Sequence, residues 1–168
     1  SGRELRGTDF CIPFAGQESV EFSAGLLFRC VNEPLLTIGV EICEDLWVAD
    51  PPSTRLAQGG ATLLLNPSAS DETVCKDAYR RTLLEATSGR LVCGYVYADA
   101  GWGESSTDLI YAGHSLIAEN GTILAERRFA TGLTITEIDL QKLAHERQRM
   151  TTYPADAPDL YPNYFELE

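Results

Sequence analysis

The chain has 168 residues, of which 44% are hydrophobic and 23% charged, and this suits one globular domain with a sizeable core. Its 13 basic and 25 acidic side chains give a formal net charge of -12, which argues against binding nucleic acid or an anionic membrane, because both attract a basic surface. No apolar run approaches the about 18 residues of a membrane span, and the N-terminus lacks a signal-peptide pattern, so we predict a cytoplasmic protein.

The cysteines argue against a metal site and against a disulfide framework. A zinc site needs clustered ligands, but the chain has no CxxC pair and only two histidines. The number of cysteines is odd, and a small disulfide-stabilised domain would be denser in them. We therefore expect reduced thiols and no bound metal, with two of the five in the apolar core, Cys30 and Cys93. The full set is Cys11, Cys30, Cys43, Cys75 and Cys93.

In the first half of the chain, a polar N-terminal stretch precedes alternating strands and turns. Residues Ser1–Gly16 are irregular and are assigned to a loop. A turn signal at Asn32–Pro34 makes the first two strands hairpin neighbours, and Ser53 is expected to cap a short helix ending near Gln58. A strand, helix, strand order with unbroken apolar runs predicts a parallel pair that is covered on both faces. The predicted strands are Ser19–Cys30, Leu35–Cys43 and Ala61–Asn66.

The second half begins with the clearest helix pattern, Cys75–Gly89, which Gly89 is expected to cap. Its apolar stripe is expected at Ala78, Tyr79, Thr82, Leu83 and Ala86, with Arg80 and Arg81 mainly off it. Asn120–Gly121 predicts a tight hairpin, and Asp139 is expected to cap a last helix ending near Arg149. The predicted strands are Leu91–Ala98, Asp108–Tyr111, Ser115–Glu119, Thr122–Phe129 and Leu133–Ile138. This order predicts an α/β sandwich with stacked sheets and helices outside.

A possible reactive thiol lies in Gly39–Trp47, which reads GVEICEDLW. An apolar run rises to Cys43 and ends there, as a buried strand does when it enters a sharp turn. Such a turn lifts a side chain out of the sheet and aims backbone N–H groups at a bound carbonyl, so Cys43 is our candidate nucleophile. The alternative is that Cys43 is a small buried hydrophobic residue.

Several separated motifs occur in one order from Phe10 to Tyr153. After GVEICEDLW come ATLLLNPSAS, KDAYRR, YVYADAGWGESSTDL and YAGHSLIAENGTILA. Together they resemble the carbon-nitrogen hydrolase (nitrilase) superfamily and, within it, the glutaminase domains of glutamine-dependent NAD synthetases. The resemblance implies a four-layer α/β/β/α sandwich. The family's nucleophile lies well past the middle of its domain, so residues 1–153 resemble the C-terminal part of such a domain, and residues 154–168 are expected to form an extended tail or linker.

The resemblance also assigns roles to five residues. It makes Cys43 the nucleophile, Glu44 and Trp47 walls of the glutamine pocket, and Ser70 and Lys76 the residues that hold the amino-acid end of the substrate. The chemistry agrees, because Glu44 suits an ammonium group and Lys76 suits a carboxylate. The plainer alternatives remain open: Ser70 as a turn residue, Lys76 as a surface charge and Trp47 as a core residue.

Two catalytic residues of the family are not found in this sequence. The family uses a glutamate as general base and a lysine that stabilises the tetrahedral intermediate, and both precede the cysteine by many residues. The chain has only two lysines, Lys76 and Lys142, and both follow Cys43. The acidic neighbours Glu41, Glu44 and Asp45 would raise the pKa of the thiol if ionised, so a base or cation is expected from elsewhere.

The resemblance therefore predicts an enzyme that hydrolyses the side-chain amide of glutamine through a cysteine thioester. In the family, the ammonia passes to a synthetase domain that uses ATP and Mg to amidate nicotinic acid adenine dinucleotide. We expect glutamine and that ATP-binding domain as partners, no cofactor in this chain, and self-association through uncovered strands. The alternatives are another amidase of the superfamily and a non-catalytic fragment that serves assembly.

Overall fold

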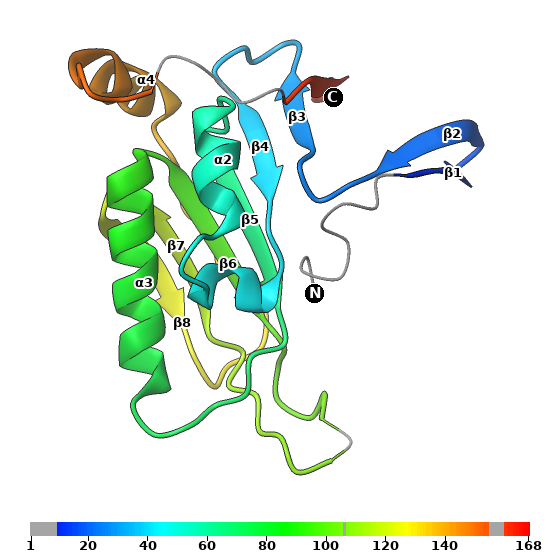
Figure 1. Ribbon diagram of the computed structural model, residues 1–168. Helices are drawn as coiled ribbons and strands as arrows, with labels where there is room; N and C mark the ends of the chain where they lie inside the picture. The colour runs from blue at the N-terminus through cyan, green and yellow to red at the C-terminus, as the bar shows by residue number, and fades with distance from the viewer. Residues whose placement is uncertain (1–9, 106, 155–159) are drawn as a thin grey trace.

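The computed structural model describes residues 10–105, 107–154 and 160–168, and its centre is one twisted sheet with helices on one face (Figure 1). The sheet has seven strands in the order β8-β7-β6-β5-β4-β3-β9, and a separate two-stranded hairpin, β1 with β2, projects away from it. The strands are β1 (Phe10–Phe14), β2 (Gln17–Phe22), β3 (Leu27–Cys30), β4 (Thr37–Val40), β5 (Leu63–Ser68), β6 (Gly94–Asp99), β7 (Ser115–Glu119), β8 (Thr122–Arg127) and β9 (Pro162–Phe165).

The middle of the sheet is parallel and its flanks are largely antiparallel. Strands β4, β5 and β6 run parallel, because α2 (Pro52–Gln58) and α3 (Lys76–Leu91) carry the chain back between them. Strand β3 pairs antiparallel with β4, and the turn at Asn120–Gly121 folds β8 back on β7. The predicted hairpins and the predicted parallel pair are therefore confirmed.

The core lies between the sheet and the helices α2 and α3. Alternate residues of a strand point to opposite faces, and those that face the helices are fully buried, as Leu64, Tyr95 and Leu116 show. Helix α3 contributes Leu84 to the same cluster, and α2 contributes Leu56. Burial of such aliphatic side chains stabilises the fold by roughly 1.5–3 kcal/mol each.

The opposite face of the sheet carries a second apolar row. Val40, Leu65 and Val96 are register partners on adjacent parallel strands, and each is only half-buried. The expected coverage of both faces is therefore only partly met within residues 10–105, 107–154 and 160–168. These residues supply one helical layer and one sheet layer of the expected four-layer sandwich.

One loop prediction and three strand predictions need correction. Phe10–Phe14 is a strand rather than loop, while residues 1–9 lie outside the described residues. The predicted strand Ser19–Cys30 is two strands, because the turn between β2 and β3 redirects the chain into the large sheet. Asp108–Tyr111 and Leu133–Ile138 form no strand. Leu133 and Ile135 are 85% and 79% exposed, and among the described residues no strand pairs with this segment.

Of the three helix caps predicted from the sequence, the structure has one. Helix α4 (Leu140–Arg149) has the predicted N-cap, since the Asp139 carboxylate accepts from the Lys142 N–H at 2.9 Å. Ser53 does not cap α2, because α2 begins at Pro52 and the Ser53 N–H is bound by the Glu41 carboxylate. Helix α3 also passes the predicted cap at Gly89 and ends at Leu91.

The tail extends the sheet. Strand β9 pairs in parallel with β3, so the last described residues lie on the edge of the large sheet (Figure 1). The domain boundary after residue 153 stays a prediction. Among the described residues, no helix combines the length and the apolar character that a bilayer crossing needs.

Gly89 brings α3 into contact with the β7–β8 turn, and its replacement tests this packing. A Cβ at position 89 would lie 3.2 Å from Gly121 Cα, and that turn is anchored by the Gly121 N–H, which donates to Ser88 Oγ at 3.1 Å. We expect Gly89→Ala to lower the free energy of unfolding by about 1–3 kcal/mol through overpacking, although Gly to Ala normally stabilises a helix. Urea unfolding measures this, with the exposed-site variant Thr82→Ala as a neutral or stabilising control.

Candidate active site

The predicted site residues gather at the carboxyl ends of the parallel strands. Cys43 follows β4, Ser70 follows β5, and Lys76 begins α3 beside them. In α/β proteins with parallel strands, ligands bind at this edge, because loops there are free to vary while the strands hold them rigidly. Lys142, the other lysine, lies at the opposite end, where it pairs with Glu119 of β7 at 2.7 Å.

Cys43 occupies a strained turn. Its φ is +50°, a left-handed conformation that a residue other than glycine rarely adopts. It is the first residue of a short 3₁₀ helix, η1 (Cys43–Trp47), and its side chain is half-buried. The turn is fastened in both directions: the Ile42 N–H donates to Asp45 Oδ2 at 2.9 Å, and the Asp45 N–H donates to the Ile42 carbonyl at 3.0 Å.

A buried asparagine holds the backbone of this turn. The Cys43 N–H donates to Asn66 Oδ1 at 2.9 Å, and Ser68 Oγ donates to the same oxygen at 2.7 Å. The amides of Cys43 and Asp45 are therefore both engaged within the protein. The expectation that this turn aims several N–H groups at a bound carbonyl thus needs correction, because at least these two point elsewhere.

Behind Asn66 lies a buried carboxylate. Asn66 Nδ2 donates to the Tyr95 hydroxyl at 3.1 Å, and that hydroxyl donates to Glu41 Oε1. Glu41 Oε2 accepts the Ser53 N–H at 2.8 Å. Glu41 is 1% exposed, and burial raises its pKa above the ordinary value although these hydrogen bonds favour the charged form.

Trp47 and Lys76 lie together, as the predicted pocket requires. Lys76 Nζ lies 5.5 Å from the centre of the Trp47 ring, and the Tyr79 ring packs against the same tryptophan at 5.6 Å. Glu44 is exposed on η1. Lys76 also pairs with Asp71 at 2.6 Å, and this hydrogen bond lowers the pKa of the Asp71 carboxyl.

Ser70 is buried, and both of its polar groups are engaged. Its N–H donates to Asp99 Oδ1 at 2.8 Å, and its hydroxyl accepts from Arg80 Nη2 at 3.3 Å. Burial raises the pKa of Asp99, the largest effect on that carboxyl. Ser70 is therefore more than an exposed turn residue, because an arginine and an aspartate fix its orientation.

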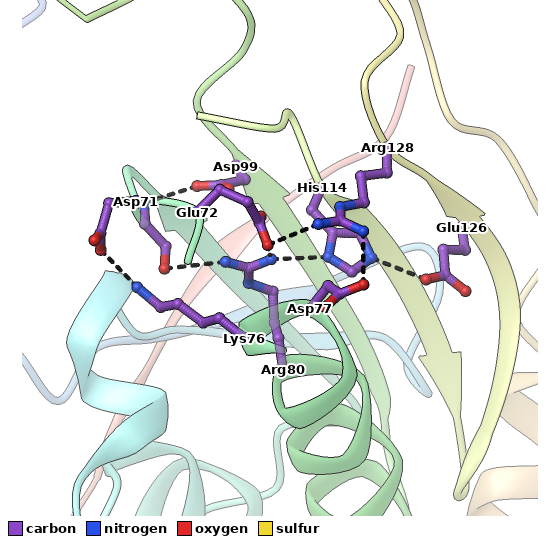
Figure 2. Close-up of polar contacts among 10 residues, drawn as sticks. Asp71, Glu72, Lys76, Asp77, Arg80, Asp99, His114, Glu126 and Arg128 are labelled. Carbon is purple, nitrogen blue, oxygen red and sulfur yellow. Dashed lines mark hydrogen bonds and ion pairs between the residues drawn. The ribbon is translucent and has the colours of Figure 1, made fainter. Parts of the chain in front are cut away.

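Arg80 is the centre of a buried ion network (Figure 2). Its guanidinium is fully buried and contacts Glu72 at 3.1 Å and His114 Nδ1 at 2.8 Å. Because arginine only donates, His114 Nδ1 accepts, and the ring proton lies on Nε2, which faces Glu126 at 2.9 Å. Arg128 adds a second cation on Glu72 at 3.0 Å.

The predicted stripe of α3 is wrong, which is why sequence reasoning missed Arg80. Four residues of that stripe, Ala78, Tyr79, Thr82 and Ala86, are exposed, while Leu83 packs against the core. A spacing of three and four residues also links the residues that the helix buries, which are Arg80, Leu84, Thr87, Ser88 and Leu91. Leu84 and Leu91 were the residues in the sequence that could have indicated the buried face of α3. No sequence pattern indicated a role for Tyr95, which resembles any other apolar strand residue.

With this geometry in place, the comparisons with known proteins assign the class. A family model described as carbon-nitrogen hydrolase matches residues 9–148, which is most of the chain. The chain therefore belongs to the carbon-nitrogen hydrolase family, and the predicted family and the nitrilase-type α/β fold are confirmed.

The similar relatives narrow the class further. The chain is 43% identical over 141 residues to a glutamine-dependent NAD(+) synthetase of Mycobacterium tuberculosis, covering 82% of this chain and 21% of that protein. It is 34% identical over 138 residues to the deaminated glutathione amidase of Mus musculus, covering 82% of this chain and 42% of that protein. The chain thus spans about a fifth of the length of the NAD synthetases that it matches.

Solved structures agree with this placement. A glutamine-dependent NAD(+) synthetase from Cytophaga hutchinsonii superposes with a TM-score of 0.59 at 31% identity, covering 77% of this chain and 20% of that one. Nit3 of Saccharomyces cerevisiae, a nitrilase-superfamily member, superposes with a TM-score of 0.60 at 21% identity, covering 69% of this chain and 42% of that one. The second likeness concerns the fold alone.

Replacing Arg80 tests whether the buried ion network supports the site. Arg80→Met removes the cation that Glu72, His114 and Ser70 share, so we expect a loss of about 3 kcal/mol in the free energy of unfolding. The adjacent Arg81→Met is the matched control, since Arg81 is 42% exposed and its ion pairs lie on the surface. Thermal unfolding of both variants decides the point, and equal losses would contradict a special role of Arg80.

Proposed function

We propose that the chain carries the nucleophile of an amidohydrolase that acts on the side-chain amide of glutamine. The observation that supports this most directly is the half-buried Cys43 thiol in a left-handed turn at the carboxyl end of β4. The similarity to glutamine-dependent NAD synthetases suggests the substrate.

In the proposed reaction, the Cys43 thiolate attacks the amide carbon and forms a tetrahedral intermediate. The carbon–nitrogen bond then breaks, and the nitrogen takes a proton and leaves as ammonia. Water attacks the resulting thioester, which releases glutamate and restores the thiol. The resemblance places the general base and the stabilising lysine of this chemistry in residues that precede Cys43 by a long distance, and no lysine precedes it within this sequence.

We assign one backbone donor next to Cys43 to the developing oxyanion. The amides of Cys43 and Asp45 are engaged with Asn66 and Ile42. The N–H of Glu44, between them, is the donor of this turn that we assign to the intermediate. One such donor is typically worth about 10²–10³ in kcat.

The pocket for the amino-acid end of glutamine is proposed at Lys76, Trp47, Glu44 and Ser70. Lys76 is the candidate for the carboxylate, but its present partner is Asp71, so substrate must exchange with that carboxylate. The exchange costs little, because the Asp71 side chain is 42% exposed and an exposed ion pair is weak. Glu44 is exposed beside the thiol and suits the ammonium group.

The wider setting follows from the same proposal. The released ammonia is passed to an ATP-binding synthetase domain, which uses ATP and Mg to amidate nicotinic acid adenine dinucleotide. The half-covered sheet face and the exposed hairpin are proposed to lie against another chain or another part of the protein, in a cytoplasmic oligomer.

A second candidate function is amide hydrolysis on a substrate other than glutamine. The similarity to deaminated glutathione amidase favours this alternative. A variant of Glu44 distinguishes the two candidate substrates. The ammonium group of glutamine needs a carboxylate partner, whereas an uncharged substrate end does not. A Glu44→Gln variant that leaves the KM for glutamine unchanged would favour the second candidate.

Replacing the nucleophile tests the first step. In the full-length protein, Cys43→Ala is expected to abolish glutamine hydrolysis but to leave synthesis from free ammonia largely intact, because only the ammonia source is lost. Cys11→Ala is the control, since Cys11 is exposed and lies on the separate hairpin. Mass spectrometry after treatment with an electrophilic glutamine analogue should find Cys43 labelled among the five cysteines. Glutamine turnover that survives in Cys43→Ala would rule the assignment out.

Lys76 and Asp71 give a paired test of substrate binding. Lys76→Ala should raise the KM for glutamine more than it lowers kcat, because a contact remote from the amide is made about equally in ground and transition states. Asp71→Asn should lower that KM, because it removes the carboxylate that competes for Lys76. Steady-state kinetics distinguish the outcomes: a kcat that falls by orders of magnitude in Lys76→Ala at unchanged KM would make the lysine catalytic instead.

A further inference from the structure

We propose that Glu41, Tyr95 and Asn66 form a positioning unit that holds the Cys43 turn in its reactive conformation. This proposal deepens the proposed function and rests on Cys43 being the nucleophile. None of the three residues need touch the substrate. They act through the backbone N–H of Cys43, the last member of a hydrogen-bonded chain that begins at the buried Glu41 carboxylate.

The chain has a fixed direction, and the carboxylate sets it. A carboxylate only accepts, so the Tyr95 hydroxyl must donate its single proton to Glu41. The hydroxyl oxygen then accepts from the amide nitrogen of Asn66 at 3.1 Å. The same nitrogen also lies 3.4 Å from the Cys43 carbonyl, to which it donates, and Asn66 presents its oxygen to the Cys43 N–H at 2.9 Å. The Glu41 charge, two residues before the proposed nucleophile, therefore favours this orientation of the Asn66 amide.

The energetics of Glu41 favour a functional reason for the charge. A carboxylate that is 1% exposed is costly to bury, and burial raises its pKa despite two hydrogen bonds. A well-packed apolar residue would be expected to stabilise the core more. A structural reason is also present, because Glu41 binds the Ser53 N–H at the start of α2. The test must therefore separate a loss of stability from a loss of positioning.

The turn needs such support because its backbone is unfavourable. A left-handed cysteine costs of order 1–3 kcal/mol and persists only where its surroundings fix it. If Asn66 released the Cys43 N–H, the turn could relax, and the thiol would move away from the substrate carbon. A displacement of about 1 Å is enough to cost about 10²-fold in rate.

Tyr95→Phe breaks the chain at its centre while it keeps the ring. In the full-length protein, we expect kcat for glutamine to fall about ten- to a hundredfold with KM changed less than about threefold, since the binding groups lie elsewhere. Tyr97→Phe is the matched control, because Tyr97 lies on the same strand, is equally buried, and its hydroxyl takes no part in the chain. It should keep kcat within about twofold of the parent.

Glu41→Gln tests the anchor without changing its shape. The amide can donate to the Tyr95 oxygen, which would turn the hydroxyl toward Asn66 and reverse the Asn66 amide. We expect a lower kcat again, and the double variant Glu41→Gln with Tyr95→Phe should be no slower than the worse single variant, because residues of one chain are not additive. Two outcomes would contradict the positioning unit. One is a loss of kcat in the double variant equal to the sum of the two single losses in free energy. The other is a loss of kcat that follows the melting temperature in all variants, including Tyr97→Phe.

A readout without glutamine keeps this test separate from the proposed function. The rate at which iodoacetamide labels Cys43, followed by peptide mass spectrometry against pH, reports the accessibility and ionisation of the thiol. The profile should shift in Tyr95→Phe and in Glu41→Gln but not in Tyr97→Phe. If the parent protein shows no glutaminase activity but the labelling shifts, the proposed function fails and the positioning unit stands. If neither labelling nor kcat changes in Tyr95→Phe, the unit is wrong.

Discussion

The structure at the carboxyl ends of the parallel strands depends on one buried negative charge. The Glu41 carboxylate accepts from the first turn of α2 through Ser53 and from β6 through Tyr95, so one side chain ties a helix and a central strand to the end of β4. Because Glu41 is only 1% exposed, each of these bonds is electrostatically strong, and each would be costly to lose. The turn that follows β4 is therefore held by contacts with α2 and β6 as well as by the hydrogen bonds within the turn.

A second buried charge organises the other side of the same edge. Arg80 gathers Glu72, His114 and Ser70 around the start of α3, so the loops after β5 and before β7 are held by one guanidinium (Figure 2). The two central charges have opposite signs, and their partners Tyr95 and Tyr97 lie two residues apart on β6, on the same face of the sheet. The chain has a net charge of -12, so basic side chains are the minority, and one of them, Arg80, is buried between these two loops.

The sequence predicted features that depend on short-range patterns. The hairpin at Asn120–Gly121, the Asp139 cap and the elbow at Cys43 each follow from a few adjacent residues, and the structure has all three turns where expected. The failures involve partners that are distant in the chain. Leu133–Ile138 alternates like a strand, but no strand in the described part of the chain pairs with it. The buried face of α3 was missed because an arginine lies on it. Glu41 and Tyr95, which share a hydrogen bond, are 54 residues apart in the sequence, so no local pattern predicts it.

The left-handed backbone of Cys43 has a consequence for how this fold can change over time. Glycine would relieve the strain at that position, and it would do so only by deleting the thiol. Under the proposed function, stability and chemistry therefore act in opposite directions on this single residue. Cys43→Gly would remove the backbone strain and, in the same step, the proposed nucleophile.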